Sequence, residues 1–81
     1  FAGDSLIGRD VNMEAGAVIA NHHNDRTDKE IVLTTAAGTI RTGVTKFGAV
    51  IGDGSKIGAN SVLSPGTLLP RGTIVPRLTL I

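Results

Sequence analysis

Large apolar residues recur every six positions along two stretches of this chain. Counted from the first residue, the hexads begin with Phe1, Ile7, Met13 and Ile19. Counted from residue 51, they begin with Ile51, Ile57, Leu63, Leu69, Val75 and Ile81. Position five of the later hexads is always Ser or Thr, and positions two and four are rich in Gly, Pro and Asn. So many registered positions indicate a real repeat.

A period of six predicts an all-β chain wound as a parallel β-helix of hexapeptide repeats. Each hexad forms one side of a triangular coil, with its first residue inside and the small fifth residue beside it. Gly, Asn and Pro supply the backbone angles of the bends. Stacked coils then pair as parallel strands roughly 4.8 Å apart. An α-helix is excluded, because a period of six spreads the apolar residues around it and eleven Gly with three Pro would break it.

The break in the repeat predicts an insertion. The interval from Ile19 to Ile51 is not a whole number of hexads. We therefore expect a single domain over residues 1–81, with hexads at 1–24 and 51–81 and a loop and hairpin at about 25–46. Residues 30–35 and 38–42 are β-rich and predict a β-hairpin extending from the β-helix. A long loop on a rigid repeat scaffold is where function usually lies.

Composition narrows the function classes. The net charge is +1 with mixed signs and only two aromatic residues are present, which argues against nucleic-acid or membrane partners. No apolar run has the length of a transmembrane helix and no signal peptide is visible, so we expect a cytoplasmic protein. There is no Cys among the 81 residues, so oligomerisation is the expected source of extra stability for so small a domain. Because the chain begins with Phe1, we expect it to be trimmed or part of a longer protein.

Two segments resemble a known family. Residues 4–12, DSLIGRDVN, followed by residues 15–21, AGAVIAN, resemble the DSxIGxxxNxxAGTxxAN stretch of sugar-1-phosphate nucleotidyltransferases that carry a C-terminal acetyltransferase domain. Residues 42–53, TGVTKFGAVIGD, resemble TGxxKxGxxIGD of the archaeal-type members. The hexads themselves resemble those of the left-handed β-helix acyltransferases. The left-handed sense is implied by this resemblance, since the period alone does not fix it.

The resemblance implies a homotrimer that transfers acetyl from acetyl-CoA to the amine of a hexosamine 1-phosphate. Asn12 and Asn21 match asparagines of the family's acceptor pocket. Lys29 lies near the position of a loop lysine that contacts the sugar phosphate, and Lys46 matches the lysine of the second motif. The asparagines also have a plain alternative as turn residues, which is about equally good for Asn12. Both lysines, like Arg41, have the alternative of solvated surface charges, and nearby carboxylates would weaken an anion site there.

The resemblance also implies that acetyl-CoA lies in the groove between neighbouring β-helices. Small residues of the late coils lie near the pantetheine arm in this family, which makes Ala59 and Ser61 the candidates for cofactor contact. A structural role is the stronger alternative for both. No metal is predicted.

The catalytic base is the weakest match. The family's catalytic His lies a few residues before the first motif, and only three residues precede Asp4 in this chain. Phe1 occupies the expected position of a pocket Tyr. Within the chain, His22 and Asn21 are the catalytic candidates, because an imidazole near neutral pH can take a proton from an attacking amine. The alternative is that both histidines are loop residues, with His23 turned inward from position five.

Two other functions compete with acyl transfer. The first is a non-catalytic hexapeptide domain that trimerises or regulates a nucleotidyltransferase. The second is metal-dependent hydration, which requires three well-spaced histidines. The sequence contains only the adjacent pair His22 and His23. We rank acyl transfer first and hydration last.

Overall fold

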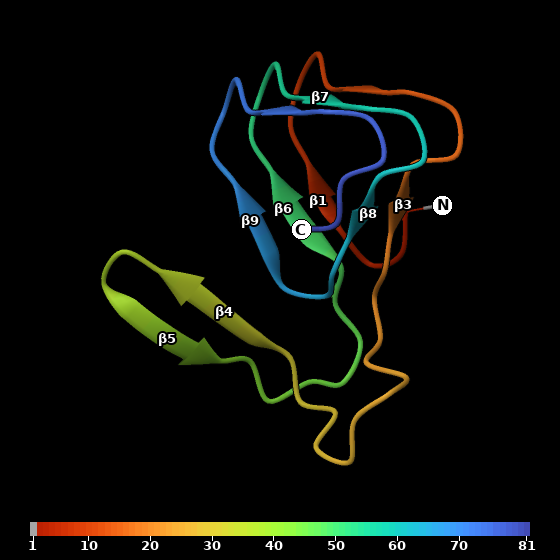
Figure 1. Ribbon diagram of the computed structural model, residues 1–81. Helices are drawn as coiled ribbons and strands as arrows, with labels where there is room; N and C mark the ends of the chain where they lie inside the picture. The colour runs from red at the N-terminus through yellow and green to blue at the C-terminus, as the bar shows by residue number, and fades with distance from the viewer. Residues whose placement is uncertain (1) are drawn as a thin grey trace.

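The computed structural model describes residues 2–81, and within this range it contains β-strands, turns and loops but no helix (Figure 1). The all-β prediction is confirmed for these residues, and none of them forms a helix that could span a membrane. The strands are β1 (Leu6–Ile7), β2 (Asn12–Met13), β3 (Val18–Ile19), β4 (Val32–Thr35), β5 (Gly38–Arg41), β6 (Ala49–Ile51), β7 (Lys56–Ile57), β8 (Val62–Leu63), β9 (Thr67–Leu69) and β10 (Ile74–Val75).

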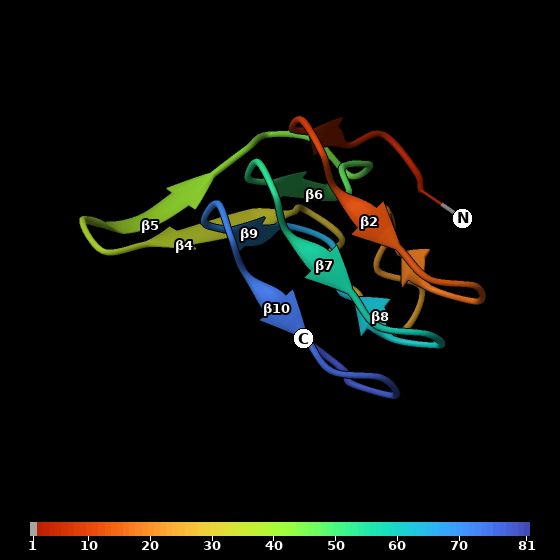
Figure 2. The same ribbon diagram turned by 90° about the horizontal axis from the view of Figure 1, so that it is seen from above.

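Eight of these strands form three small parallel sheets, in the orders β1-β6-β9, β10-β7-β2 and β3-β8. Successive strands enter the three sheets in turn, so the chain returns to the same sheet after three hexads (Figures 1 and 2). Val50 of β6, for example, pairs with Leu68 of β9, which stands three hexads later. This arrangement is consistent with a β-helix. We call residues 2–20 and 48–81 the stack.

The core of the stack is a column of residues from position one of the hexads. Ile19, Ile57 and Leu63 have no exposed surface, and each such side chain contributes about 1.5–3 kcal/mol through its burial. Ser55 and Ser61, from position five, are also fully buried. The Ser55 hydroxyl donates to the Gly52 carbonyl at 2.8 Å, so a small polar residue fits inside without an unpaired group.

Position four explains the pattern of turn residues. Every residue with a left-handed φ inside the stack stands at this position, namely Asp4, Asp10, Gly16, Gly54, Asn60, Gly66, Gly72 and Leu78. Gly, Asn and Asp adopt this conformation at the lowest cost, which is why they recur there. Leu78, with φ of 59° and a side chain 80% exposed, has no such advantage.

Position six faces outward, and the three sheets differ in what they place there. The β1-β6-β9 sheet presents Leu6, Val50 and Leu68, and the β3-β8 sheet with its flanking bridge presents Val18, Val62 and Leu80. The β10-β7-β2 sheet presents Asn12, Lys56 and Ile74. Two outer faces are therefore apolar, and Leu6 and Leu80 on them are 65% and 74% exposed. The third face is mixed.

The insertion, residues 22–46, leaves the stack at one corner. Leu6 pairs with Val50 across the insertion, whereas Val50 pairs with Leu68 after the regular three hexads. The insertion therefore lengthens one turn of the chain without shifting the strand register on either side of it. It closes on itself, because the Phe47 amide donates to the Asn21 carbonyl at 2.9 Å. We call this closure the neck.

The predicted hairpin is present within the insertion. Strands β4 and β5 are antiparallel, and Thr35 pairs with Gly38 across a tight connection formed by Ala36 and Ala37. The hairpin lies beside β9 rather than projecting freely (Figures 1 and 2). Just before it, Ile31 is fully buried, and a Cβ added to Gly66 would approach Ile31 Cγ2 to 3.0 Å. Close packing thus holds the start of the hairpin against the stack.

Candidate functional site

A surface groove of about 370 Å³ runs along the mixed face, over the β10-β7-β2 sheet. Its polar lining comes from Asn12, Glu14, Lys56 and Arg77. Gly58 and Ile74 contribute to its walls. Of the site residues predicted from the sequence, Asn12 is the one that lines this groove. The groove therefore combines an amide, two cations and one carboxylate over an apolar base.

Glu14 ties the groove together across three successive passes of the chain. Its Oε1 accepts from the Ala59 amide and from Arg77 Nε, each at 2.9 Å, and its Oε2 accepts from Arg77 Nη2 at 2.9 Å. The hydrogen bond from Arg77, followed by that from Ala59, lowers the pKa of Glu14. The hydrogen bond to Glu14 in turn raises the pKa of Arg77. Arg77 is thus largely neutralised by its partner.

Lys56 is the groove cation whose side chain has no hydrogen bond or ion pair within residues 2–81. It is exposed and stands between Asn12 and Ile74 in the strand register. Sequence reasoning did not select Lys56, Glu14 or Arg77. A signal for these residues exists in the sequence, because every third hexad contributes to the same sheet. It can be used only once the strand register across the insertion is known.

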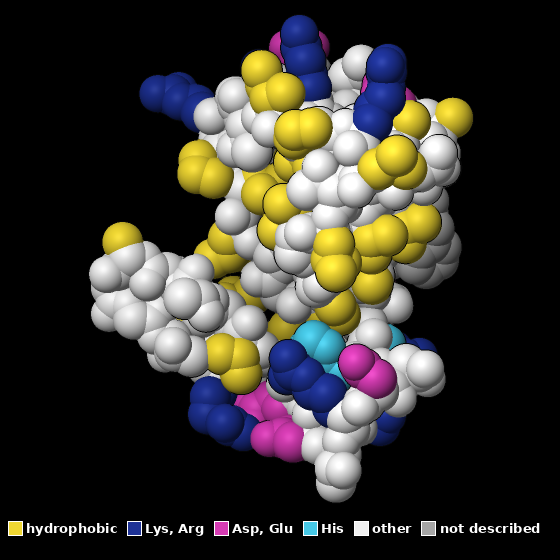
Figure 3. All heavy atoms as spheres, viewed as in Figure 1, with side chains coloured by type: hydrophobic (Ala, Val, Ile, Leu, Met, Phe, Trp, Pro, Cys, Tyr) yellow, Lys and Arg dark blue, Asp and Glu magenta, His cyan; other side chains and the backbone are white. Residues whose placement is uncertain are grey.

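A second group of polar residues gathers at the neck. Asn21 is half-buried, and its Nδ2 donates to Asp4 Oδ2 at 2.9 Å. His22 and His23 follow and are half-buried. The histidine side chains lie between the body of the stack and the charged loop beneath it (Figure 3). Burial, followed by the charge of Arg26, lowers the pKa of His23.

The two predicted lysines lie on the insertion. Lys29 Nζ donates to the carbonyls of His23 at 3.1 Å and Asn24 at 3.4 Å, so it folds the loop back on itself. An ammonium group has three donors, which leaves one for a ligand. Lys46 is exposed and directly precedes Phe47, the residue that closes the neck.

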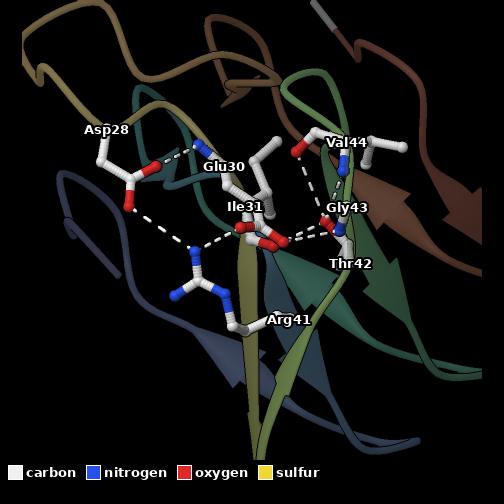
Figure 4. A network of polar contacts seen from close by, with 7 residues as sticks. All are labelled: Asp28, Glu30, Ile31, Arg41, Thr42, Gly43 and Val44. Atoms are coloured by element: carbon white, nitrogen blue, oxygen red, sulfur yellow. Dashed lines mark hydrogen bonds and ion pairs between the residues drawn. The ribbon is translucent and has the colours of Figure 1, made fainter.

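The positive charge of Arg41 is balanced by two carboxylates. It forms an ion pair with Glu30 and a longer one of 3.6 Å with Asp28 (Figure 4). Glu30 Oε2 also accepts from the Gly43 amide at 2.8 Å. The Glu30 carboxylate raises the pKa of Arg41. These contacts close the base of the hairpin and agree with the expectation that nearby carboxylates would offset the charge of Arg41.

Ala59 and Ser61, the predicted cofactor contacts, have internal partners in this chain. The Ala59 amide donates to Glu14, and its carbonyl accepts from Leu78 N at 3.0 Å. The Ser61 hydroxyl is buried, donates to the Pro76 carbonyl at 2.8 Å and accepts from Thr79 N at 3.2 Å. Both contacts favour the structural alternative weighed from the sequence. Ala59, which is half-buried beside a glycine of the groove wall, keeps a small side chain at the surface.

The structure places the predicted residues in two separate groups. Asn12 stands on β2, whereas Asn21 lies just after β3, which belongs to a different sheet. Within residues 2–81 no hydrogen bond joins them. No group of three or more His, Cys, Asp or Glu in this part of the chain is arranged to hold a metal ion.

Fold and side chains together define an all-β protein of parallel sheets, with a groove on one face and a polar loop at one corner. No family model matches the chain. Over 56 residues it is 45% identical to the bifunctional protein GlmU of Methanococcus vannielii. The match covers 69% of this chain and 13% of GlmU, so the chain spans a small part of that relative's length.

Proposed function

We propose that this chain is an acyltransferase domain that moves acetyl from acetyl-CoA to the amine of an amino-sugar phosphate. The observation that carries the proposal is the position of Asn21. It stands in the segment that resembles the family's acceptor pocket, at the point where the regular strands open into the loop bearing His22 and Lys29. The partial similarity to GlmU supports the same family. A left-handed β-helix is part of this proposal and rests on the resemblance.

The neck residues have the chemistry that an acceptor site needs. Lys29, through its remaining donor, and Lys46 would hold the phosphate, and Asn21 would bind the sugar near its amine. His22 would take the proton as the amine attacks the thioester carbonyl. The carbonyl–sulfur bond then breaks and CoA leaves as its thiol. Such catalysis is mostly positioning with general-base assistance and needs no covalent enzyme intermediate.

The groove on the mixed face has the chemistry that a CoA site needs. The Lys56 side chain is exposed and has no hydrogen bond or ion pair within residues 2–81, which suits it to a phosphate of CoA. Ile74, which is 71% exposed, offers apolar surface to the pantetheine arm. Ala59, which follows Gly58 of the groove wall, would permit close approach because its side chain is small.

Assembly as a homotrimer would explain two features of the single chain. The outer faces of the β1-β6-β9 and β3-β8 sheets each carry a row of apolar side chains instead of single scattered ones. Contact between subunits would bury these rows. Asn12 stands on β2 and Asn21 follows β3 of a different sheet, and a pocket at a subunit boundary would allow both to contact one acceptor. The number three rests on the resemblance, and the apolar faces support assembly as such.

The second candidate is a trimerising or regulatory domain without catalysis. One observation favours it: Ala59 and Ser61, the residues predicted to contact the cofactor, have hydrogen-bond partners within the chain itself. In this case the histidine pair would be loop residues, and the groove would not bind acetyl-CoA.

Acetyl-CoA binding by calorimetry, with oligomeric mass measured on the same sample, tests the proposal. Micromolar binding to a trimer, with about one CoA per subunit, supports acyl transfer. A clean trimer that does not bind acetyl-CoA supports the scaffold function instead.

Substitutions at the neck sharpen this test. Asn21→Ala should leave the mass unchanged and lower acetyl transfer at least about tenfold, because it removes a hydrogen bond to the acceptor. Asn24→Ala, at an exposed loop position, is the matched control and should have no effect. His22→Gln should lower acetyl transfer because it removes the general base, whereas His23→Gln should leave it unchanged. Dissociation of the oligomer in Asn21→Ala would contradict the site assignment.

A further inference from the structure

The Asn21 side chain is held at one end only. Its Nδ2 donates to Asp4 Oδ2 at 2.9 Å, and its Oδ1 has no hydrogen-bond partner within residues 2–81. The amide also lies against Gly3, where an added Cβ would approach both Asn21 Cγ and Nδ2 to 2.6 Å. Gly3 therefore leaves the space in which the amide rests, and Asp4 anchors the nitrogen end.

Asp4 is itself fixed by its surroundings. Its backbone has φ of 43°, a left-handed conformation that Asp tolerates better than most residues. Its carbonyl accepts from Gly48 N at 3.0 Å, which ties it to the strand that follows the insertion. The neighbouring Ser5 hydroxyl donates to the Gly3 carbonyl at 2.8 Å and accepts from Ala49 N at 3.0 Å. Asp4 is thus held on both sides by the stack.

We propose that Asp4 is a positioning residue that fixes which end of the Asn21 amide faces the ligand. A carboxylate only accepts hydrogen bonds, so the amide must turn its NH₂ group toward Asp4 and its oxygen away. Asn21 then presents a fixed hydrogen-bond acceptor at the neck. The ligand group that fits is a donor, an amine or a hydroxyl, and a carbonyl is disfavoured. This inference rests on the proposed function, for which the donor is the acceptor amine.

A site built to accept one hydrogen bond discriminates strongly against an analogue that lacks the donor, because its own polar group is left unpaired. We expect the chain to bind glucosamine 1-phosphate at least about tenfold more tightly than 2-deoxyglucose 1-phosphate. Asp4 sets this preference without contacting the ligand.

The test compares Asp4 with Asp10, a built-in control. Both are exposed and have a left-handed φ, but the Asp10 side chain makes no hydrogen bond within residues 2–81. Asp4→Gly removes the carboxylate and tolerates the backbone angle. Asp4→Asn keeps the shape but can either donate or accept, so it no longer dictates the orientation of Asn21. Asp10→Gly and Asp10→Asn make the same changes at a position without such a contact.

The first readout is the side-chain amide resonance of Asn21 in NMR spectra of the full chain. Bonding to Asp4 should separate the two Nδ2 protons and slow the exchange of one with water. Asp4→Gly should abolish both effects, and Asp10→Gly should preserve them. An Asn21 resonance that is unchanged by Asp4→Gly overturns the inference whatever the ligand does.

The second readout is the preference for glucosamine 1-phosphate over 2-deoxyglucose 1-phosphate by calorimetry. The Asp4 variants should lose the preference while their affinity for acetyl-CoA is unchanged, and the Asp10 variants should keep it. Full discrimination in Asp4→Gly overturns the inference. If the unaltered chain binds neither sugar while Asp4→Gly still releases the Asn21 amide, the proposed function is wrong and the orienting role of Asp4 is supported.

Discussion

The stack and the insertion are held together by different means. In the stack, the side chains of Ile57 and Leu63 are fully buried, and backbone amides bond from one pass of the chain to the next, as Gly52 N does to Leu69 O at 2.8 Å. Among the described residues of the insertion, Ile31 is the large side chain that is fully buried. Exposed ion pairs of Arg41 close the base of the hairpin. Exposed pairs of this kind contribute little to stability.

The difference teaches where stability and function can be separated. The stack derives its stability from a repeated column of apolar residues, so each pass of the chain supports the next. The insertion derives its shape from local polar contacts and from packing at Ile31. Changes inside the column should therefore lower the stability of the whole fold, whereas changes on the hairpin should affect the hairpin alone.

The largest expected effect is that of Ile57→Ala. The side chain has no exposed surface, so truncation leaves a cavity in the column and should lower the free energy of unfolding by about 2–5 kcal/mol. Ile40→Ala is the control, since Ile40 on β5 is 52% exposed and should change stability by less than about 0.5 kcal/mol. Urea unfolding followed by circular dichroism measures both. Equal losses would contradict the division between column and hairpin.

A smaller loss is expected from Ser61→Ala. The Pro76 carbonyl keeps a donor in the Thr79 hydroxyl at 2.7 Å, but the Thr79 amide loses the acceptor that Ser61 Oγ provides. An unpaired amide inside the stack should cost about 1–3 kcal/mol. Thr39→Ala on the exposed hairpin is the matched loss of one hydroxyl and should be close to neutral. A neutral Ser61→Ala would show that water reaches the interior of the column.

The smallest effects are those of pH, and they fall in two separate windows. The pKa of His23 is lowered from 6.5 mainly by burial, so the unfolded state binds the proton more readily. Stability should decline as the pH falls below about 6.5 and level off below the folded-state pKa. The pKa of Glu14 is lowered from 4.5, so its contribution is present above that value and is lost as the pH falls through the lowered pKa.

Single substitutions assign each window to its region. His23→Gln should remove the decline in the urea midpoint that begins below about pH 6.5 and leave the more acidic decline. Glu14→Gln should weaken the acidic decline and leave the upper window. If both substitutions alter the same window, the insertion and the stack do not titrate independently.

The stack was predictable from the sequence because its information is periodic. Position one identified the buried column, although Ile7 and Ile81 near the two ends of the described chain are 45% and 46% exposed. Position five identified the buried Ser55 and Ser61, and positions four and two identified the turns. The site of the insertion followed from the break in the spacing between Ile19 and Ile51. These features need no knowledge of which distant residues meet.

Features that depend on long-range register were not predicted. The contact of Glu14 with Arg77 joins distant parts of the chain, and it can be foreseen only once the length of the insertion is known. The packing of the hairpin beside β9 depends on the direction in which the chain leaves the neck, which a six-residue period does not encode. The Asp4–Asn21 pair was hidden for the same reason, although both residues stood in the motif.

The neck has a consequence for how this protein could diversify. Because the chain leaves at Asn21 and rejoins at Phe47 through one backbone hydrogen bond, the strands on either side resume their register whatever lies between. The entropy of closing a loop grows only slowly with its length. The corner is therefore an insertion site. Segments of other lengths and chemistries could be inserted there, and a new specificity could arise without changes to the stack.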